Sequence, residues 1–289
     1  MLSEFDLEMP SDLQASLSSL PYATPLGGGT NLLVDLRARR EKSKRLVWLG
    51  NIQAFREIKI NAQQVSIGGG TTLSDILHSP AMAEAAPSLF NAAHVFGGQM
   101  VRNRATVAGN ICSGSPAADT VPPLLSLDAT ICLTNAEGCR SVPLDQFYTG
   151  FKTNLRRQDE LITGLSWLVP NSNTANLFYK LARRKGDAIT VVGVAVTVTR
   201  EGDRCTHARI ALGSVGPTVF RAKDAEAMLA GGILSEKLIN DAAQKAMEQS
   251  KPIDDLRASA NYRRHSVRVL TRRLITQAWH SLPEKTAHT

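Results

Sequence analysis

The chain is organised around residues 101–120, which read VRNRATVAGNICSGSPAADT. This stretch is rich in Gly, Ser, Thr and Asn, yet apolar residues flank it on both sides, which is typical of ordered backbone pressed against a neighbour. Its glycines permit positive φ or close approach by another molecule. Thr106 and Asn110 offer short polar groups to an anion, and Asp119 offers a carboxylate to a ribose or a ring N–H. The alternative is a simple Gly/Ser turn between two strands.

A second glycine-rich stretch favours the first interpretation. Residues 25–33 read PLGGGTNLL, and successive N–H groups in such a loop can form a nest for an anion. Three consecutive glycines are costly in backbone entropy, so they indicate close approach by a ligand or by another backbone. The loop is not a P-loop, because no Gly-Lys-Ser/Thr follows, and it does not match the GxGxxG dinucleotide fingerprint.

Together, the early GGGTNL loop and the later RNRATVAGNICSGSPAAD segment resemble the FAD-binding (medium) subunit of the molybdenum hydroxylases. That family includes xanthine dehydrogenase, carbon monoxide dehydrogenase and bacterial N-heterocycle hydroxylases. The resemblance continues through Phe178-Tyr179-Lys180 and residues 183–187 into a basic C-terminal helix, so it covers nearly the whole chain. It implies an α+β fold, with a two-part FAD-binding domain of the vanillyl-alcohol-oxidase-like (PCMH) type and a smaller α+β C-terminal domain like that of the carbon monoxide dehydrogenase flavoprotein.

The resemblance also implies a function. The chain would be an oxidoreductase subunit with non-covalent FAD, which takes electrons from a small iron–sulfur subunit and passes them to an external acceptor. Two-iron iron–sulfur clusters and molybdopterin would lie on partner subunits, and the large molybdopterin subunit would hydroxylate the substrate. The isolated chain is therefore not expected to hydroxylate anything, and neither the substrate nor the acceptor is encoded in it.

The expected cofactor-binding residues come from the two glycine-rich stretches and from positions that the resemblance implies. They are Leu26, Gly27, Gly28, Gly29, Thr30, Asn31, Leu32, Phe96, Val101, Thr106, Gly109, Asn110, Cys112, Asp119, Ile162 and Lys180. Backbone N–H groups of residues 27–31 and 106–110 would hold the diphosphate. By resemblance, the Ile162 backbone lies against the flavin ring, and Lys180 and Asp119 contact the flavin or its ribityl chain. A cation such as Lys180 beside the flavin would raise its potential. No catalytic residue and no metal ligand is expected.

Composition and charge argue against a membrane protein, a secreted protein and a nucleic-acid-binding protein. Hydrophobic residues make up 43% of the chain and charged residues 20%, which is ordinary for a globular protein. No apolar run approaches the roughly 18 residues of a membrane helix, and the start lacks the features of a signal peptide. The net charge is +7, but the basic residues are dispersed and few aromatics accompany them, so nucleic acid is not an expected partner. The four cysteines have no metal-ligand spacing and are typical of free thiols in a reducing cytoplasm.

We expect three units, at residues 1–55, 56–172 and 173–289. The expected helices are at residues 12–17, 31–40, 73–77, 81–95 (divided from the previous one at Pro80), 121–129, 222–229, 235–249 and 260–279. The expected strands are at residues 22–26, 45–49, 65–70, 130–134, 139–142, 158–165, 177–182, 191–199 and 208–214. Residues 171–176 are the best candidate for a linker.

Two features of the second unit have competing explanations. The glycine run at residues 68–70 copies the first loop, but a structural turn after a strand is favoured over a second phosphate site. His94 could carry a covalently attached flavin, as a histidine does in related flavoproteins, but a packed or capping histidine is favoured.

Two other functions stay open at this point. A self-sufficient FAD oxidoreductase, such as a cell-wall precursor reductase, would need a proton donor facing the flavin, and the third unit has no clear one. A non-enzymatic binding module would not need two glycine loops suited to one cofactor. The sequence also departs from its relatives, which often have an aromatic residue where Ala188 and Ile189 follow Asp187. The flavin face could therefore be more open here.

Overall fold

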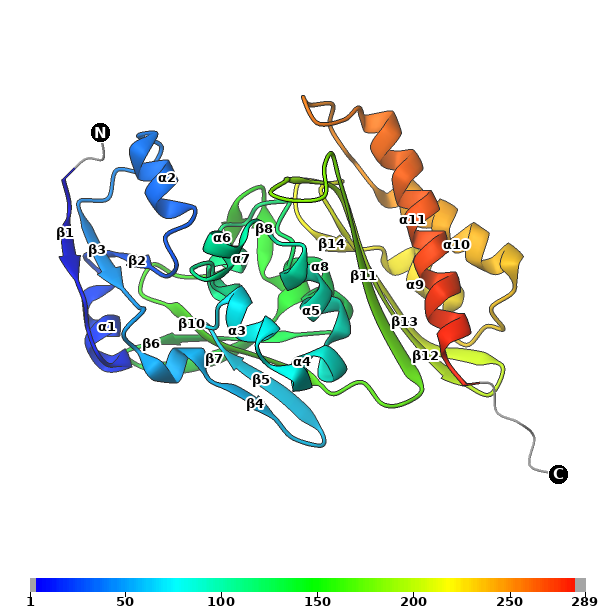
Figure 1. The fold of residues 1–289 in the computed structure, drawn as a ribbon, viewed down its shortest axis with the longest axis horizontal. Helices are drawn as coiled ribbons and strands as arrows, with labels where there is room; N and C mark the ends of the chain where they lie inside the picture. The colour runs from blue at the N-terminus through cyan, green and yellow to red at the C-terminus, as the bar shows by residue number, and fades with distance from the viewer. Residues whose placement is uncertain (1–3, 284–289) are drawn as a thin grey trace.

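The computed structural model describes residues 4–283, which form three main sheets arranged in succession along the long axis of the molecule (Figure 1). The first sheet is parallel and has the strand order β1-β3-β2. Its strands are β1 (Asp6–Glu8), β2 (Thr24–Leu26) and β3 (Arg45–Trp48). They are connected by α1 (Leu13–Ser19), which is capped by the Asp12 carboxylate, and by the six-residue α2 (Leu32–Arg37).

The second sheet is antiparallel and has the order β4-β5-β10-β6-β7. Its strands are β4 (Ile58–Ile60), β5 (Gln64–Gly68), β6 (Thr130–Asn135), β7 (Gly138–Pro143) and β10 (Leu161–Leu168). The neighbours Ile67, Leu165 and Ile131 are paired across three of these strands, and all are buried. One face of the sheet is therefore a core face, as an alternating strand pattern requires.

Short helices follow β5 and belong to the same part of the chain. They are α3 (Leu73–Leu77), α4 (Pro80–Ala85), α5 (Pro87–His94), α6 (Gln99–Arg102), α7 (Val107–Cys112) and α8 (Val121–Ser126). A small hairpin and two 3-10 turns complete it: β8 (Tyr148–Gly150), β9 (Thr153–Asn154), η1 (Gln53–Arg56) and η2 (Leu144–Gln146).

The third sheet is antiparallel, with its four strands in chain order and helices on both faces. Its strands are β11 (Thr174–Ala182), β12 (Thr190–Glu201), β13 (Arg204–Gly213) and β14 (Phe220–Arg221). Helices α9 (Lys223–Leu229), α10 (Glu236–Gln249) and α11 (Ala260–Ser281) lie on one side of it, and α5 and α8 lie on the other (Figure 1). Because both faces are covered, β12 is buried along nearly its whole length, which explains the apolar run from Val191 to Val196.

The structure confirms most of the expected elements but also has ones that were not expected: β1, β4, β8, β9, β14, α6 and α7. Several expected segments have other bounds. The helix expected at residues 81–95 is two helices, since Ala86 has φ −153° and Pro87 starts α5. A residue before proline is disfavoured in helical geometry. The helix expected at 31–40 ends at Arg37. The linker is shorter than expected because β11 begins at Thr174. Within residues 4–283, no helix combines the length and the apolar character that crossing a membrane requires.

Candidate cofactor site

A cavity of about 1290 Å³ lies where the three sheets and their loops meet. This exceeds the roughly 300–1000 Å³ of ordinary small-molecule sites, so it has room for a long ligand. Every expected site residue except Leu26 lines it. Leu26 is buried instead against Leu36 and Leu46, so its side chain belongs to the core of the first sheet.

The first glycine-rich loop offers a row of free backbone donors. Among residues 4–283, no atom accepts a hydrogen bond from any backbone N–H of residues 27–32, and all of these residues line the cavity. Buried or half-buried backbone N–H groups rarely stay without an acceptor. The row therefore fits an anionic ligand such as a diphosphate.

The loop also packs tightly against the central segment. A Cβ atom added to Gly27 would lie 3.1 Å from the Thr106 hydroxyl oxygen, and one added to Gly28 would lie 1.7 Å from the Arg104 carbonyl oxygen. Gly29 has φ +75°, which other residues rarely adopt. Gly28 and Gly29 are thus required by the fold itself, and Gly27 leaves little room for a side chain.

The central segment does not offer the backbone donors that we expected of it. Thr106 caps α7 by accepting from the Gly109 N–H at 3.1 Å. The N–H groups of Val107 and Ala108 donate to the Thr71 and Gly69 carbonyls, at 3.0 and 3.2 Å. The Asn110 N–H donates to the Thr106 carbonyl oxygen at 3.0 Å. Since the N–H groups of residues 107–110 are occupied, this segment contributes side chains to the cavity instead.

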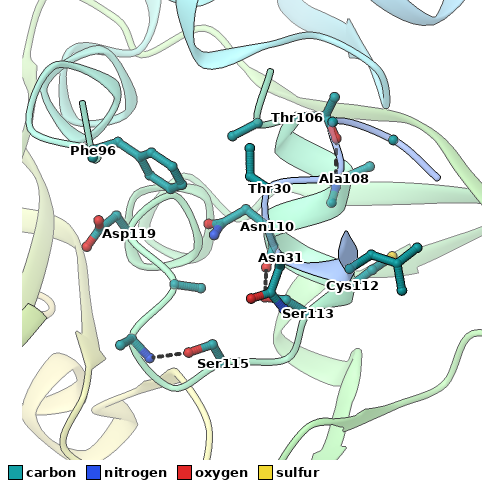
Figure 2. A pocket seen from close by; sticks show the side chains of 18 of the residues that line it. Thr30, Asn31, Phe96, Thr106, Ala108, Asn110, Cys112, Ser113, Ser115 and Asp119 are labelled. Carbon is teal, nitrogen blue, oxygen red and sulfur yellow. Dashed lines mark hydrogen bonds between the residues drawn. The ribbon is translucent and has the colours of Figure 1, made fainter. Parts of the chain in front are cut away.

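Those side chains lie across the middle of the cavity. Figure 2 shows Thr30 and Asn110 between Phe96 and Asp119 on one side and Ala108 and Cys112 on the other. Asn110 Oδ1 accepts from the Thr120 N–H and hydroxyl at 3.2 and 2.7 Å. Its Nδ2 has no acceptor in the part of the chain that the structure describes, so it is available to a ligand.

Four of the expected site residues bring apolar side chains to the cavity lining: Phe96, Val101, Cys112 and Ile162. Phe96 and Val101 line the cavity, and Val101 is 37% exposed. Cys112 also lines it, and burial raises the pKa of its thiol. Ile162 lies beside Gly69, where an added Cβ would come within 2.0 Å of the Ile162 carbonyl oxygen.

The glycine run at residues 68–70 is explained by packing. Added Cβ atoms would lie 2.2 Å from the Phe55 carbonyl oxygen at Gly68 and 2.0 Å from that of Ile162 at Gly69. These contacts require glycine at positions 68 and 69 whatever is bound, which fits a structural turn. Gly69 and Gly70 also line the cavity, so the structural interpretation stays a prediction. His94 is neither packed nor a lining residue; it is exposed in the last turn of α5.

An ion pair forms part of the cavity wall. Lys180 Nζ lies 2.6 Å from Asp119 Oδ2, and their side chains are only 6% and 8% exposed. Lys180 also donates to the Val95 carbonyl oxygen at 3.2 Å, and the Thr190 hydroxyl donates to Asp119 Oδ1. Burial holds the pKa of Asp119 above its ordinary value, although Lys180 and Thr190 both favour the carboxylate. The structure thus brings Asp119 and Lys180 together in the lining of a cavity that Ile162 also lines.

Sequence reasoning missed most of the C-terminal contribution to the cavity, since it named only Lys180 and the departure at Ala188 and Ile189, all of which line it. The further lining residues come from three loops that are far apart in sequence and from α11: Asp187, Ser214, Gly216, Pro217, Lys251, Pro252, Ile253, Asp255, Arg257 and, on α11, Arg263. No spacing pattern marks them, because only the packing of the third sheet brings these loops together. Across residues 4–283, no group of three or more His, Cys, Asp and Glu side chains is arranged to hold a metal.

Comparison with known proteins agrees with this geometry. Residues 5–171 match the family described as the FAD binding domain in molybdopterin dehydrogenase, and residues 177–278 match the CO dehydrogenase flavoprotein C-terminal domain. The chain is 30% identical to the carbon monoxide dehydrogenase medium chain of Hydrogenophaga pseudoflava, over 88% of both chains. It is 31% identical to the glyceraldehyde dehydrogenase medium chain of Sulfolobus acidocaldarius, over 93% of this chain and 96% of that one. A solved structure of the Hydrogenophaga pseudoflava carbon monoxide dehydrogenase superposes with a TM-score of 0.94, at 29% identity, over 98% of this chain and 100% of the other.

Proposed function

Because the chain belongs to the family of molybdopterin dehydrogenase FAD-binding subunits, we propose that it is the FAD-containing electron-transfer subunit of a heteromeric molybdenum hydroxylase. The observation that carries the proposal is the row of free N–H groups at residues 27–32 on the cavity wall. Bound FAD would supply the redox chemistry, since no other redox centre is expected in this chain.

The residues of the cavity fit FAD in a particular way. The N–H groups of residues 27–32 would hold the diphosphate, and the Asn110 amide would add a donor beside it. We place the flavin beside Asp119 and Lys180 with the Ile162 backbone against its ring, since all three residues line the cavity. Phe96 would pack against the cofactor on the flavin side (Figure 2). The attachment is non-covalent in this proposal, and His94 is not among the lining residues.

The partner subunits complete the proposal. The similar proteins are named as medium chains, which implies further subunits. We assign two-iron iron–sulfur clusters to a small partner and molybdopterin to a large one, and we propose that electrons pass from the clusters through FAD to an external acceptor. The four free cysteines fit a reducing cytoplasm. The units at residues 1–55, 56–172 and 173–289 are part of the proposal, and each holds one main sheet.

A charge placed on the glycine loop tests the cofactor assignment. Thr30 is exposed and lines the cavity, so Thr30→Asp should leave the empty fold intact. The added carboxylate would face the diphosphate, and we expect FAD affinity to fall at least tenfold, because like charges a few ångströms apart repel by about 1–4 kcal/mol. Flavin content and FAD titration by fluorescence quenching measure this.

The matched control is Ser172→Asp. Ser172 is also exposed but does not line the cavity, so the same added charge should leave FAD affinity unchanged. If Thr30→Asp retains wild-type affinity, the diphosphate does not lie on this loop. Hydroxylation of a purine, aldehyde, N-heterocycle or carbon monoxide by the chain alone would contradict the electron-transfer role and favour a self-sufficient enzyme.

A further inference from the structure

Thr190 connects the ion pair in the cavity wall to the C-terminal part of the chain. Its hydroxyl donates to Asp119 Oδ1, while Lys180 holds the other carboxylate oxygen at 2.6 Å. Thr190 is only 3% exposed and lies at the first position of β12. The Asp119 carboxylate is therefore fixed through both of its oxygens, by one neutral and one cationic donor.

Thr190 is itself held in place by a second layer of contacts. The Ser214 hydroxyl donates to the Thr190 carbonyl oxygen at 3.0 Å. Ser214 has φ +64°, its N–H donates to the Pro116 carbonyl oxygen at 2.7 Å, and its own carbonyl oxygen accepts from Arg263 Nη1 at 2.8 Å. Arg263 is 3% exposed and also pairs with Asp255 at 2.7 Å. These contacts leave Thr190 little freedom to move away from Asp119.

We propose that Thr190 is a positioning residue that keeps Asp119 as the counter-ion of Lys180, so that the flavin meets a fixed ion pair rather than a bare ammonium group. This inference rests on the proposed binding of FAD in the cavity. It predicts that Lys180 and Asp119 have opposite effects on the reduction potential of the flavin, although both lie in the same wall of the cavity.

The sign of each effect follows from electrostatics. An unpaired cation next to the flavin stabilises the electron-rich reduced form and raises its potential, whereas a carboxylate close to that cation cancels much of its field. Removing Lys180 should therefore lower the potential, and removing the charge of Asp119 should raise it. Loss of the Thr190 hydroxyl should act like a weaker loss of Asp119, because an unsupported buried carboxylate is less stable in its charged form.

The test is a redox titration of the flavin in the purified chain. Asp119→Asn should raise the flavin potential relative to wild type, and Thr190→Val should raise it by a smaller amount. Thr190→Ser restores the hydroxyl and should return the potential to the wild-type value. Lys180→Met should lower it. Thr199→Val is the matched control, because Thr199 lies on the same strand and its hydroxyl bonds Thr174 at 2.8 Å, away from the cavity.

The outcomes separate the two proposals. A wild-type chain that binds no FAD contradicts the proposed function. If the wild-type chain binds FAD and either Asp119→Asn or Thr190→Val keeps the wild-type flavin potential, the inference alone is overturned. The inference is also overturned if Thr199→Val shifts the flavin potential as much as Thr190→Val does. It is overturned as well if Thr190→Ser does not have the wild-type potential. If Thr190→Val does not fold, Thr190→Ala removes the same hydroxyl and takes its place, and a wild-type potential in Thr190→Ala overturns the inference.

Discussion

The backbone carbonyl of Arg104 fills the space that a side chain at Gly28 would need. A Cβ atom at position 28 would lie 1.7 Å from the Arg104 oxygen, far inside any allowed contact. The two glycine-rich stretches, more than seventy residues apart in the chain, are thus packed backbone to backbone. A glycine that looks like a ligand-binding signature is also a contact between two segments of the fold.

We therefore expect Gly28→Ala to destabilise the chain even without FAD. Relieving the clash requires the backbone of one segment to move, and such overpacking costs about 1–3 kcal/mol or more. The melting temperature of the flavin-free variant measures this. Gly186→Ala is the control, because nothing lies within 4 Å of its Cβ position. If the flavin-free Gly28→Ala variant melts like wild type, the contact between the segments is not as close as described.

A second prediction concerns the boundary between the second and third sheets. Asp128 bonds Arg221 at 2.6 Å, Arg209 at 2.7 Å and His207 at 3.6 Å. Burial alone would raise the pKa of Asp128, but His207, Arg221 and Arg209 together hold it below its ordinary value. A group with a lowered folded-state pKa stabilises the fold above its unfolded pKa of about 3.9, and this contribution disappears as the pH falls through the folded value.

Asp128→Asn should therefore lower the free energy of unfolding by about 1 kcal/mol above pH 5, a modest figure because Asp128 is 42% exposed. The difference from wild type should shrink as the pH falls below about 4. Denaturant unfolding at several pH values measures it. Asp128 has φ +52°, which asparagine tolerates, so the substitution changes charge and little else. A difference that does not vary between pH 3 and pH 6 would contradict the electrostatic account.

The cysteines should differ in reactivity. Cys139 is exposed, whereas Cys205 is fully buried, and burial raises the pKa of Cys205 to about 11. Because the reagent must reach the thiol and the thiolate is the reactive form, iodoacetamide at pH 8 should modify the exposed Cys139 and leave Cys205 unmodified in the folded chain. Mass spectrometry of digested samples measures the order. Early labelling of Cys205 would show that the third sheet opens locally.

FAD should stabilise the whole chain, because all three parts contribute lining residues to its cavity. At a free concentration of 100 times Kd, a ligand that binds only the folded state adds about 2.7 kcal/mol. Thermal melting with increasing FAD should show this rise. Riboflavin lacks the diphosphate that residues 27–32 would hold, so it should give a much smaller shift at the same concentration. Equal shifts from FAD and riboflavin would argue against the diphosphate assignment.

Local sequence patterns predicted those features that depend on neighbours in the chain. The PLGGGTNLL loop, the β12 run and the lining position of Asp119 follow from glycine content and apolar spacing. The Asp119–Lys180 contact joins residues that are 61 positions apart, and only the resemblance suggested that they belong to one site. Thr190 and Ser214 gave no signal, because their role depends on how the third sheet packs against the second.

The errors also have physical causes. The N–H groups of Val107 and Ala108 were expected to face a ligand, but the carbonyls of Thr71 and Gly69 occupy them, and no local pattern reports such a tertiary partner. Leu26 precedes the glycine loop, yet the alternation of its strand directs it into the core beside Leu36. The break at Ala86 could have been expected from Pro87 alone.

The unequal state of the two glycine-rich segments has a consequence for amide hydrogen exchange. Within residues 4–283 the N–H groups of residues 27–32 have no acceptor, whereas those of residues 107–110 are already bonded to the protein. The first segment should therefore take up deuterium quickly without FAD and slowly with it, while the second should exchange slowly in both states. Exchange at residues 27–32 would then report on FAD binding. Exchange at residues 107–110, which contact them, would report on the integrity of the fold in the same sample.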